Sequence, residues 1–137
     1  MSPETYLGYS RLQYLVPSAV TDRDAAAVYH FPARLPLGGM AWSGTWTDHA
    51  QEATAGHGAR LELSFLAREV YLALGGHGRI GVTVNGRQVA AIEVSGVPRL
   101  YTLYHATAAR TGRVLLTLRP GVRAYDFTLR LASGYIR

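Results

Sequence analysis

Hydrophobic and polar residues alternate with a period of two along most of the chain from residue 38 onward. In the segment 40–47, Met40, Trp42 and Trp46 share one face, while serine and threonine occupy the other. Successive side chains of a strand point to opposite faces, so this alternation predicts β-strands. The same pattern recurs in the segments 61–65, 70–74, 80–84, 89–94, 99–107, 112–118 and 125–131.

Turn signals separate these predicted strands. Asn85-Gly86 supplies the two positive-φ residues of a type I′ hairpin turn. The alternation slips by one residue near Ala67-Arg68, which predicts a β-bulge or a turn there. Many short strands with no intervening helical pattern indicate an all-β fold, and we expect an antiparallel β-sandwich of jelly-roll type.

The N-terminal segment 1–37 follows a different pattern. Its prolines break any long helix, so it is expected to be irregular, with a helical turn at 22–27 where a capping side chain precedes alanines. We predict that 1–37 packs on the sandwich or links it to an upstream domain, and that 38–137 forms the sandwich itself. The prolines of this segment are Pro3, Pro17, Pro32 and Pro36.

Composition narrows the classes of partner. A chain of 137 residues fits one domain. Its net charge is +5, but the arginines are spread from Arg11 to Arg137 without the clustered stripe typical of nucleic-acid binding. No apolar run approaches the roughly 20 residues of a membrane span, so direct membrane insertion is not expected. The absence of cysteine excludes disulfides, thiol nucleophiles and thiolate metal sites.

Candidate catalytic and metal-binding groups are sparse. The histidines lack any metal-ligand spacing, and Asp48, His49 and Glu52 are interpreted as ordinary loop charges, so no metal and no cofactor are predicted. Acidic residues such as Glu69 and Asp126 fall at outward strand positions and are interpreted as solvated. No nucleophile elbow or P-loop is present, and we predict that the chain is not an enzyme.

The two tryptophans lie four residues apart on one predicted strand. A rise of roughly 3.3 Å per residue would separate them by about 13 Å, a span of about two to three sugar rings. The polar opposite face favours a core position for both, with Gly44 leaving room for a side chain of the facing sheet. Trp46 lies nearer the strand end and is retained as a candidate ligand-binding residue.

Tyrosines offer a second candidate surface, because the chain has nine of them against three phenylalanines. If their strands are neighbours, Tyr71 and Tyr101 would form a shallow exposed groove with Arg68 and Arg99 that binds a ligand. The alternative is cross-strand aromatic pairing that only stabilises the sheet. A further pair of tyrosines near the N-terminus is predicted to dock a neighbouring domain, namely Tyr6 and Tyr9.

Six stretches resemble, in the same order, the C-terminal domain of DipZ-type thiol–disulfide interchange proteins of the thioredoxin family. They are 2–11, 41–55, 59–75, 82–86, 99–105 and 118–129, of which PETYLG and PGVRAYDFT are the most specific. The resemblance implies a β-sandwich similar to carbohydrate-binding modules, placed after an extracytoplasmic thioredoxin-like domain in a membrane-anchored protein. It also implies that the present chain is a piece of a longer protein.

The resemblance implies a non-catalytic binding or interaction module outside the cytoplasmic membrane. Its partners would be the upstream thioredoxin-like domain and either envelope glycan or a protein substrate. No Cys-x-x-Cys is present, so the redox chemistry would belong to the neighbouring domain. The alternative is a purely structural docking module that binds no small ligand.

Overall fold

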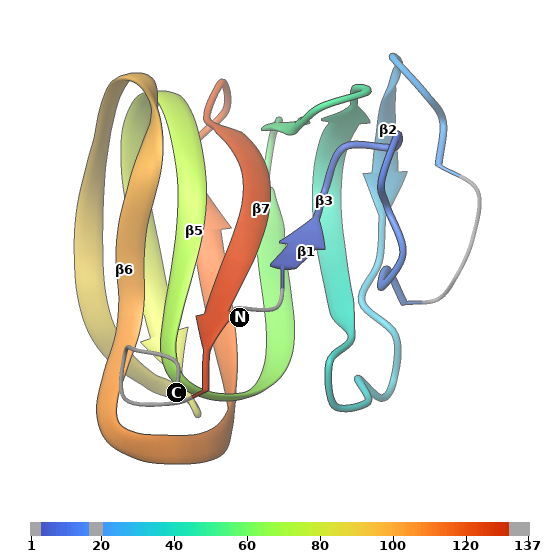
Figure 1. The fold of residues 1–137 in the computed structure, drawn as a ribbon. Coiled ribbons are helices and arrows are strands. Elements are labelled where there is room, and N and C mark those ends of the chain that lie inside the picture. Colours follow the sequence, from blue (N-terminus) through green and yellow to red (C-terminus); the bar gives the residue numbers. More distant parts are fainter. Residues whose placement is uncertain (1–3, 17–20, 132–137) are drawn as a thin grey trace.

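The computed structural model describes residues 4–16 and 21–131, which form seven β-strands (Figure 1). All strand pairs are antiparallel. Within these ranges no helix is long and apolar enough to cross a membrane. The strands are β1 (Glu4–Tyr6), β2 (Ala26–Tyr29), β3 (Met40–Asp48), β4 (Ala53–Ala55), β5 (Arg60–Val84), β6 (Arg87–Leu118) and β7 (Arg123–Arg130).

Two long strands, β5 and β6, bend and pass through both layers of a β-sandwich. One layer, which we call the first sheet, begins with β1, which pairs with β7. β7 pairs in turn with residues 69–75 of β5, and this part of β5 pairs on its other side with residues 96–105 of β6. Figure 1 shows these four strands side by side. The second sheet contains β2, β3 and the remaining parts of β5 and β6. The predicted antiparallel sandwich of jelly-roll type is confirmed.

The hydrophobic core fills the space between the two sheets. Inward positions of the strands supply nearly all of its residues, as the period of two predicts. The predicted turn is confirmed by φ angles of 51° at Asn85 and 81° at Gly86. The predicted irregularity near Ala67-Arg68 is also present, because the pairing register shifts between Ala67 and Glu69, with the additional residues on β6. The largest fully buried side chains include Trp46, Phe65, Phe127, Leu72 and Leu116.

The tryptophan pair lies inside this core and is much closer than a regular strand allows. The ring centroids of Trp42 and Trp46 are 5.4 Å apart with an interplanar angle of 20°, so the expected separation of about 13 Å is wrong. β3 pairs with β5 as far as Ser43 and with β4 from Trp46 onward. Between them Gly44 has φ +81°, so the strand departs from extended geometry between the two tryptophans.

The N-terminal segment is more regular than its prolines indicated. β1 adds a strand to the first sheet, and Leu7 just after it is completely buried. β2 pairs with residues 44–47 of β3, so the expected helical turn at 22–27 is wrong. Hydrogen bonding to the free side of β3 overrides the helix propensity of the alanines. This segment therefore packs on the sandwich as part of its two sheets.

Candidate functional site

The outward side of the first sheet carries an ordered array of polar and aromatic residues, which we call the outer face. Strand pairing places Tyr6 opposite Asp126, and Thr128 between Glu4 and Tyr71. The inward neighbours on these strands are buried, so the array lies on a rigid base. The outer face comprises Glu4, Tyr6, Glu69, Tyr71, Leu100, Thr102, His105, Asp126, Thr128 and Arg130.

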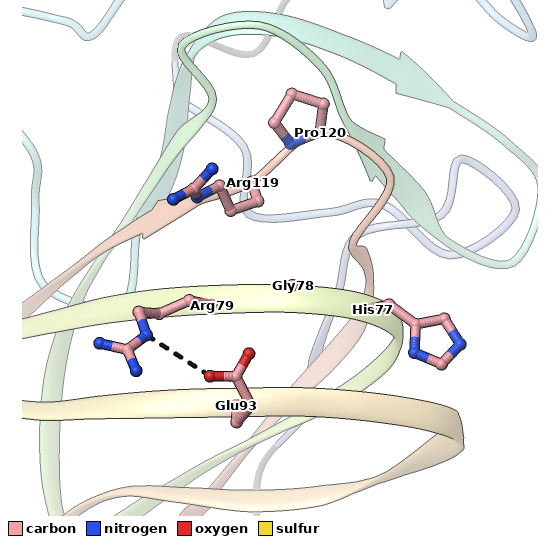
Figure 2. Close-up of a pocket in the computed structure, with 6 residues that line it drawn as sticks. All are labelled: His77, Gly78, Arg79, Glu93, Arg119 and Pro120. Carbon is pink, nitrogen blue, oxygen red and sulfur yellow. Dashed lines mark hydrogen bonds and ion pairs between the residues drawn. The ribbon is translucent and has the colours of Figure 1, made fainter.

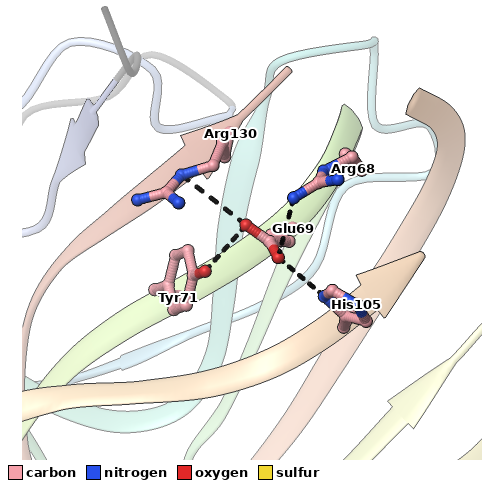
Figure 3. A network of polar contacts seen from close by, with 5 residues as sticks. All are labelled: Arg68, Glu69, Tyr71, His105 and Arg130. Atoms are coloured by element: carbon pink, nitrogen blue, oxygen red, sulfur yellow. Dashed lines mark hydrogen bonds and ion pairs between the residues drawn. The ribbon is translucent and has the colours of Figure 1, made fainter. Parts of the chain in front are cut away.

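Glu69 is the centre of a polar network on this face (Figure 3). The Tyr71 hydroxyl donates to its Oε1 at 2.8 Å, and His105 Nδ1 lies 2.7 Å from its Oε2. Arg68 Nη2 approaches Oε2 at 3.3 Å, and Arg130 Nε lies 3.6 Å from Oε1. Only 8% of the Glu69 side chain is exposed. One shielded carboxylate thus holds groups from β5, β6 and β7 in place.

The network lies beside an irregularity in the pairing of β5 with β6. Ala67 pairs with Arg110 and Glu69 with His105, so the additional residues of this irregularity lie on β6. Ala67 and Val70 are both buried, and Arg68 between them contacts the carboxylate of Glu69. Arg68 Nε is buried and has no hydrogen-bond partner among the described residues. Two arginines and one histidine surround a single carboxylate, so this part of the outer face carries excess positive charge.

The electrostatics of the network favour an ionised Glu69. The hydrogen bond from Tyr71 is the main cause that lowers the pKa of Glu69, and His105 and Arg68 act in the same direction. Burial, followed by the hydrogen bond to Glu69, raises the pKa of Tyr71. The network is therefore a fixed arrangement of a carboxylate, a phenol and cationic groups, and it presents hydrogen-bond donors to a partner.

Arginines also lie over both tyrosine rings of the outer face. The Arg130 guanidinium carbon is 5.7 Å from the centre of the Tyr71 ring, and that of Arg11 is 3.9 Å from the Tyr6 ring. Cation–π contacts of this kind stabilise exposed ring positions by about 0.5–1 kcal/mol. Each of the two rings therefore has an arginine as a fixed neighbour.

Two carboxyl groups share the end of the outer face near β1. Burial, and then a hydrogen bond with Glu4, raise the pKa of Asp126 to about 6. The same hydrogen bond lowers the pKa of Glu4. Two neighbouring carboxylates cannot both ionise without repulsion, so the pair holds one proton in mildly acidic solution. The interpretation of Asp126 as a solvated charge is wrong, as it is for Glu69.

The structure brings together only part of the predicted tyrosine groove. Tyr71 lies on the outer face, as does Tyr6, and Arg68 contacts the outer-face residue Glu69. Tyr101 pairs with the inward residue Leu72 and packs against the core, and the Arg99 guanidinium lies 5.0 Å from its ring centre. Tyr71 and Tyr101 are therefore on opposite sides of the first sheet, and a single groove that contains both is not formed.

Two further candidates lie away from the outer face. Trp46 is completely buried and donates through Nε1 to the Ser43 carbonyl oxygen at 2.9 Å, so its assignment as a ligand-binding residue is wrong. The Tyr9 hydroxyl donates to Asp24 at 2.8 Å, and the Asp24 carboxylate also lies 3.0 Å from His49 Nδ1. Tyr9 thus fastens the N-terminal segment to the loops around β3.

Asp48 is completely buried at the end of β3, beside these loops. Its Oδ2 accepts a hydrogen bond of 2.7 Å from Thr21, but its Oδ1 has no partner among the described residues. Burial raises the pKa of Asp48 to about 6. In the part of the chain that the structure describes, no three histidine or acidic side chains are grouped so that they could hold a metal ion.

Because the pKa of Asp48 is raised, ionisation of this carboxyl group is expected to lower the free energy of unfolding. The folded state binds the proton more tightly than the unfolded state, so the free energy of unfolding falls as pH rises from about 4 through about 6. We expect Asp48→Asn to be more stable than the wild type by about 1–2 kcal/mol at pH 7.5, but not at pH 4. Urea unfolding across this pH range measures the difference.

The exposed carboxyl group of Asp22 provides the control for this experiment. Asp22→Asn removes a carboxyl group from the surface and should change the free energy of unfolding by less than about 0.5 kcal/mol. The free energy of unfolding will still depend on pH in both variants, because the pKa of Asp126 is also raised. A difference between Asp48→Asn and the wild type that stays constant from pH 4 to pH 7.5 would contradict the prediction.

A shallow depression of about 430 Å³ lies at one end of the sandwich, over the glycine-rich part of β5 (Figure 2). Arg79 Nε donates to Glu93 Oε1 at 3.4 Å, and both side chains are largely exposed. None of its lining residues is a tryptophan, tyrosine or phenylalanine, so it lacks the large aromatic rings on which sugar rings commonly stack. Its lining residues are His77, Gly78, Arg79, Glu93, Arg119 and Pro120.

The hydrophobic pattern of the sequence did not identify the centre of the candidate site, which is the polar network around Glu69. Glu69, His105 and Arg130 lie far apart in the sequence, and each looks like a solvated outward residue. The alternation of Glu69 and Tyr71 on one face of a strand was the available signal, because a phenol two residues away reaches a carboxylate on the same side.

Comparison with known proteins identifies the family of this sandwich. Residues 2–129 match the family model described as thioredoxin like C-terminal domain. The chain belongs to this family. The C-terminal domain is 29% identical over 131 residues to protein DipZ of Mycobacterium bovis and of Mycobacterium tuberculosis. The match covers 93% of the chain but 18% of each DipZ protein, so the domain corresponds to one part of a larger protein.

Solved structures show the same fold at low sequence identity. The domain superimposes on a family two carbohydrate esterase from Cellvibrio japonicus with a TM-score of 0.57 and 14% identity. It also superimposes on an acetyl xylan esterase from Butyrivibrio proteoclasticus with a TM-score of 0.58 and 11% identity. The similarity covers 96% and 100% of this chain but 35% of each esterase chain. These likenesses establish the sandwich fold alone.

Proposed function

We propose that this C-terminal domain is a non-catalytic interaction module of a DipZ-type thiol–disulfide interchange protein, located outside the cytoplasmic membrane. In this proposal, the outer face docks against the thioredoxin-like domain of the same protein and orients it toward its substrate. The Glu69 network carries the proposal, because it fixes cationic and phenolic groups from three strands in one rigid array.

Several features favour a protein partner over a glycan. Both tryptophans are buried and stack on each other, which removes the strongest candidates for sugar stacking. The remaining outer-face rings, Tyr6 and Tyr71, are each partly covered by an arginine. Tyr and Arg are enriched at the centres of protein interfaces. The domain has no cysteine, so any redox role would be indirect.

Charge reversal of Arg130 tests the proposed docking face. We expect Arg130→Glu to weaken binding of the thioredoxin-like domain of a DipZ-type protein at least about tenfold, because it removes a cation and places a second carboxylate beside Glu69. Titration of the ¹⁵N-labelled chain, followed by amide chemical shifts, gives both the affinity and the surface. The wild-type shifts should centre on Glu69, Tyr71 and Thr128.

Arg79→Glu is the matched control. Arg79 is an exposed arginine of β5 that, like Arg130 of β7, contacts one glutamate, but it lies away from the outer face. Its reversal should leave binding unchanged. Cello-oligosaccharides and soluble peptidoglycan fragments form a second arm of the titration. Saturable sugar binding on the outer face, with no shifts from the thioredoxin-like domain, would contradict docking and support a glycan-binding module.

A further inference from the structure

The first sheet ends in an open strand edge. Residues 99–105 of β6, which we call the edge segment, pair with residues 69–74 of β5 on one side. No other strand of the described residues pairs with the opposite side. The backbone N–H and C=O groups of that side are therefore available to another extended chain.

The edge segment lacks the usual protection against strand addition. Natural edges are shielded by charged residues, by proline or by covering loops. Pro98 precedes the segment, but the stretch from Leu100 to Tyr104 contains no charge, no proline and no glycine. Leu100 is 53% exposed on the outer side, and Val97 just before it is 77% exposed. Tyr101 packs on the rim of the core and is half-buried.

The side chains on this edge define what an added strand would contain. An apolar residue on its inner side would cover the Tyr101 ring, and another on its outer side would cover Leu100. Arg99 stands exposed at one end of the segment, so an acidic residue would pair with it, whereas His105 at the other end already contacts Glu69. A second copy of this chain fits less well, because antiparallel self-pairing about Thr102 would place His105 of the other copy opposite Arg99 and offer it no acidic partner.

We propose that residues 99–105 form a strand-addition site that binds an extended polypeptide segment of another protein, with alternating apolar residues and an acidic residue opposite Arg99. Main-chain hydrogen bonds would supply the affinity, and the ion pair with Arg99 would set the register. The proposal concerns an edge of the sheet and does not depend on the function assigned to the outer face.

A peptide titration of the intact chain tests this site. The probe is a seven-residue peptide of alternating valine and threonine with aspartate at both ends, and its matched control has prolines at two central positions. We expect the probe to shift the amides of 99–105 and to slow their hydrogen exchange, while the proline peptide does neither. Arg99→Glu should lower the affinity for the probe at least about threefold. It should raise the affinity for the same peptide with lysine at both ends.

Arg87→Glu, at the other end of β6, is the control and should leave both affinities unchanged. Equal binding of the valine and proline peptides would overturn the proposal, as would shifts that centre on Glu69 and Tyr71 instead of the edge segment. Analytical ultracentrifugation without peptide tests whether a second copy of this chain occupies the edge segment. A dimer whose amides 99–105 exchange slowly would assign this edge to a second copy and overturn the choice of partner.

Discussion

Replacement of Trp46 by alanine is expected to lower the free energy of unfolding by about 3–5 kcal/mol. The indole is completely buried and stacks on Trp42 at 5.4 Å. Its removal leaves a cavity that the sheets can fill only partly, and the Ser43 carbonyl oxygen loses its donor. Domains of this size are stable by about 5–15 kcal/mol, so the variant should lose about a fifth or more of its stability.

Urea unfolding followed by far-UV circular dichroism measures this loss, and Trp46→Phe is the matched control. Phenylalanine keeps a ring against Trp42 but gives up the indole N–H, so its cost should be about 1–2 kcal/mol. Intrinsic fluorescence of the wild type should be blue-shifted and resistant to acrylamide, because Trp42 is buried as well. A cost below about 1 kcal/mol for the alanine variant would contradict the assignment of Trp46 to the core.

The sequence predicts the sandwich well because strand burial has a simple period. Alternation places Leu61, Leu63 and Leu72 inward, and Asn85-Gly86 forms its turn without help from the rest of the fold. The helical turn at 22–27 fails for the opposite reason. Alanine has a weak local preference for helix, while the free side of β3 offers real hydrogen bonds to an extended chain.

The candidate site is harder to predict because it depends on how strands are placed side by side. Alternation required either Tyr101 or Tyr104 to face away from the core. A register shift in the pairing with β5 turns both toward it, and Tyr104 packs on Phe65 with ring centroids 5.1 Å apart. The network around Glu69 needs residues from three strands. A period of two shows which side a residue faces, but not which residues lie beside it.

Gly44 shows the same limit at a single position. The sequence suggested that its missing side chain makes room for a large residue of the facing sheet. In the structure the constraint comes from the backbone, because a Cβ at Gly44 would overlap the carbonyl group of Gly58. The φ of +81° at this position is a second constraint, since residues with a Cβ rarely adopt it. The glycine therefore allows β3 to change partner from β5 to β4.

Gly44→Ala is expected to cost at least about 3 kcal/mol. The left-handed backbone contributes about 1–2 kcal/mol of this, and displacement of the Gly58 backbone contributes the rest. Gly58→Ala separates the two contributions, because Gly58 has a similar φ of +67° but open space where its Cβ would lie. That control should cost only about 1–2 kcal/mol.

Near-UV circular dichroism connects this cost to the tryptophan pair. If the kink at Gly44 brings the two rings together, Gly44→Ala should weaken the coupled signal of the stacked indoles, while Gly58→Ala should preserve it. If the two variants are equally stable, the overlap between a Cβ at position 44 and the Gly58 carbonyl group is removed by a small backbone shift. The close packing of Trp42 and Trp46 would then have to arise from the surrounding core, and a regular strand at Gly44 would be compatible with it.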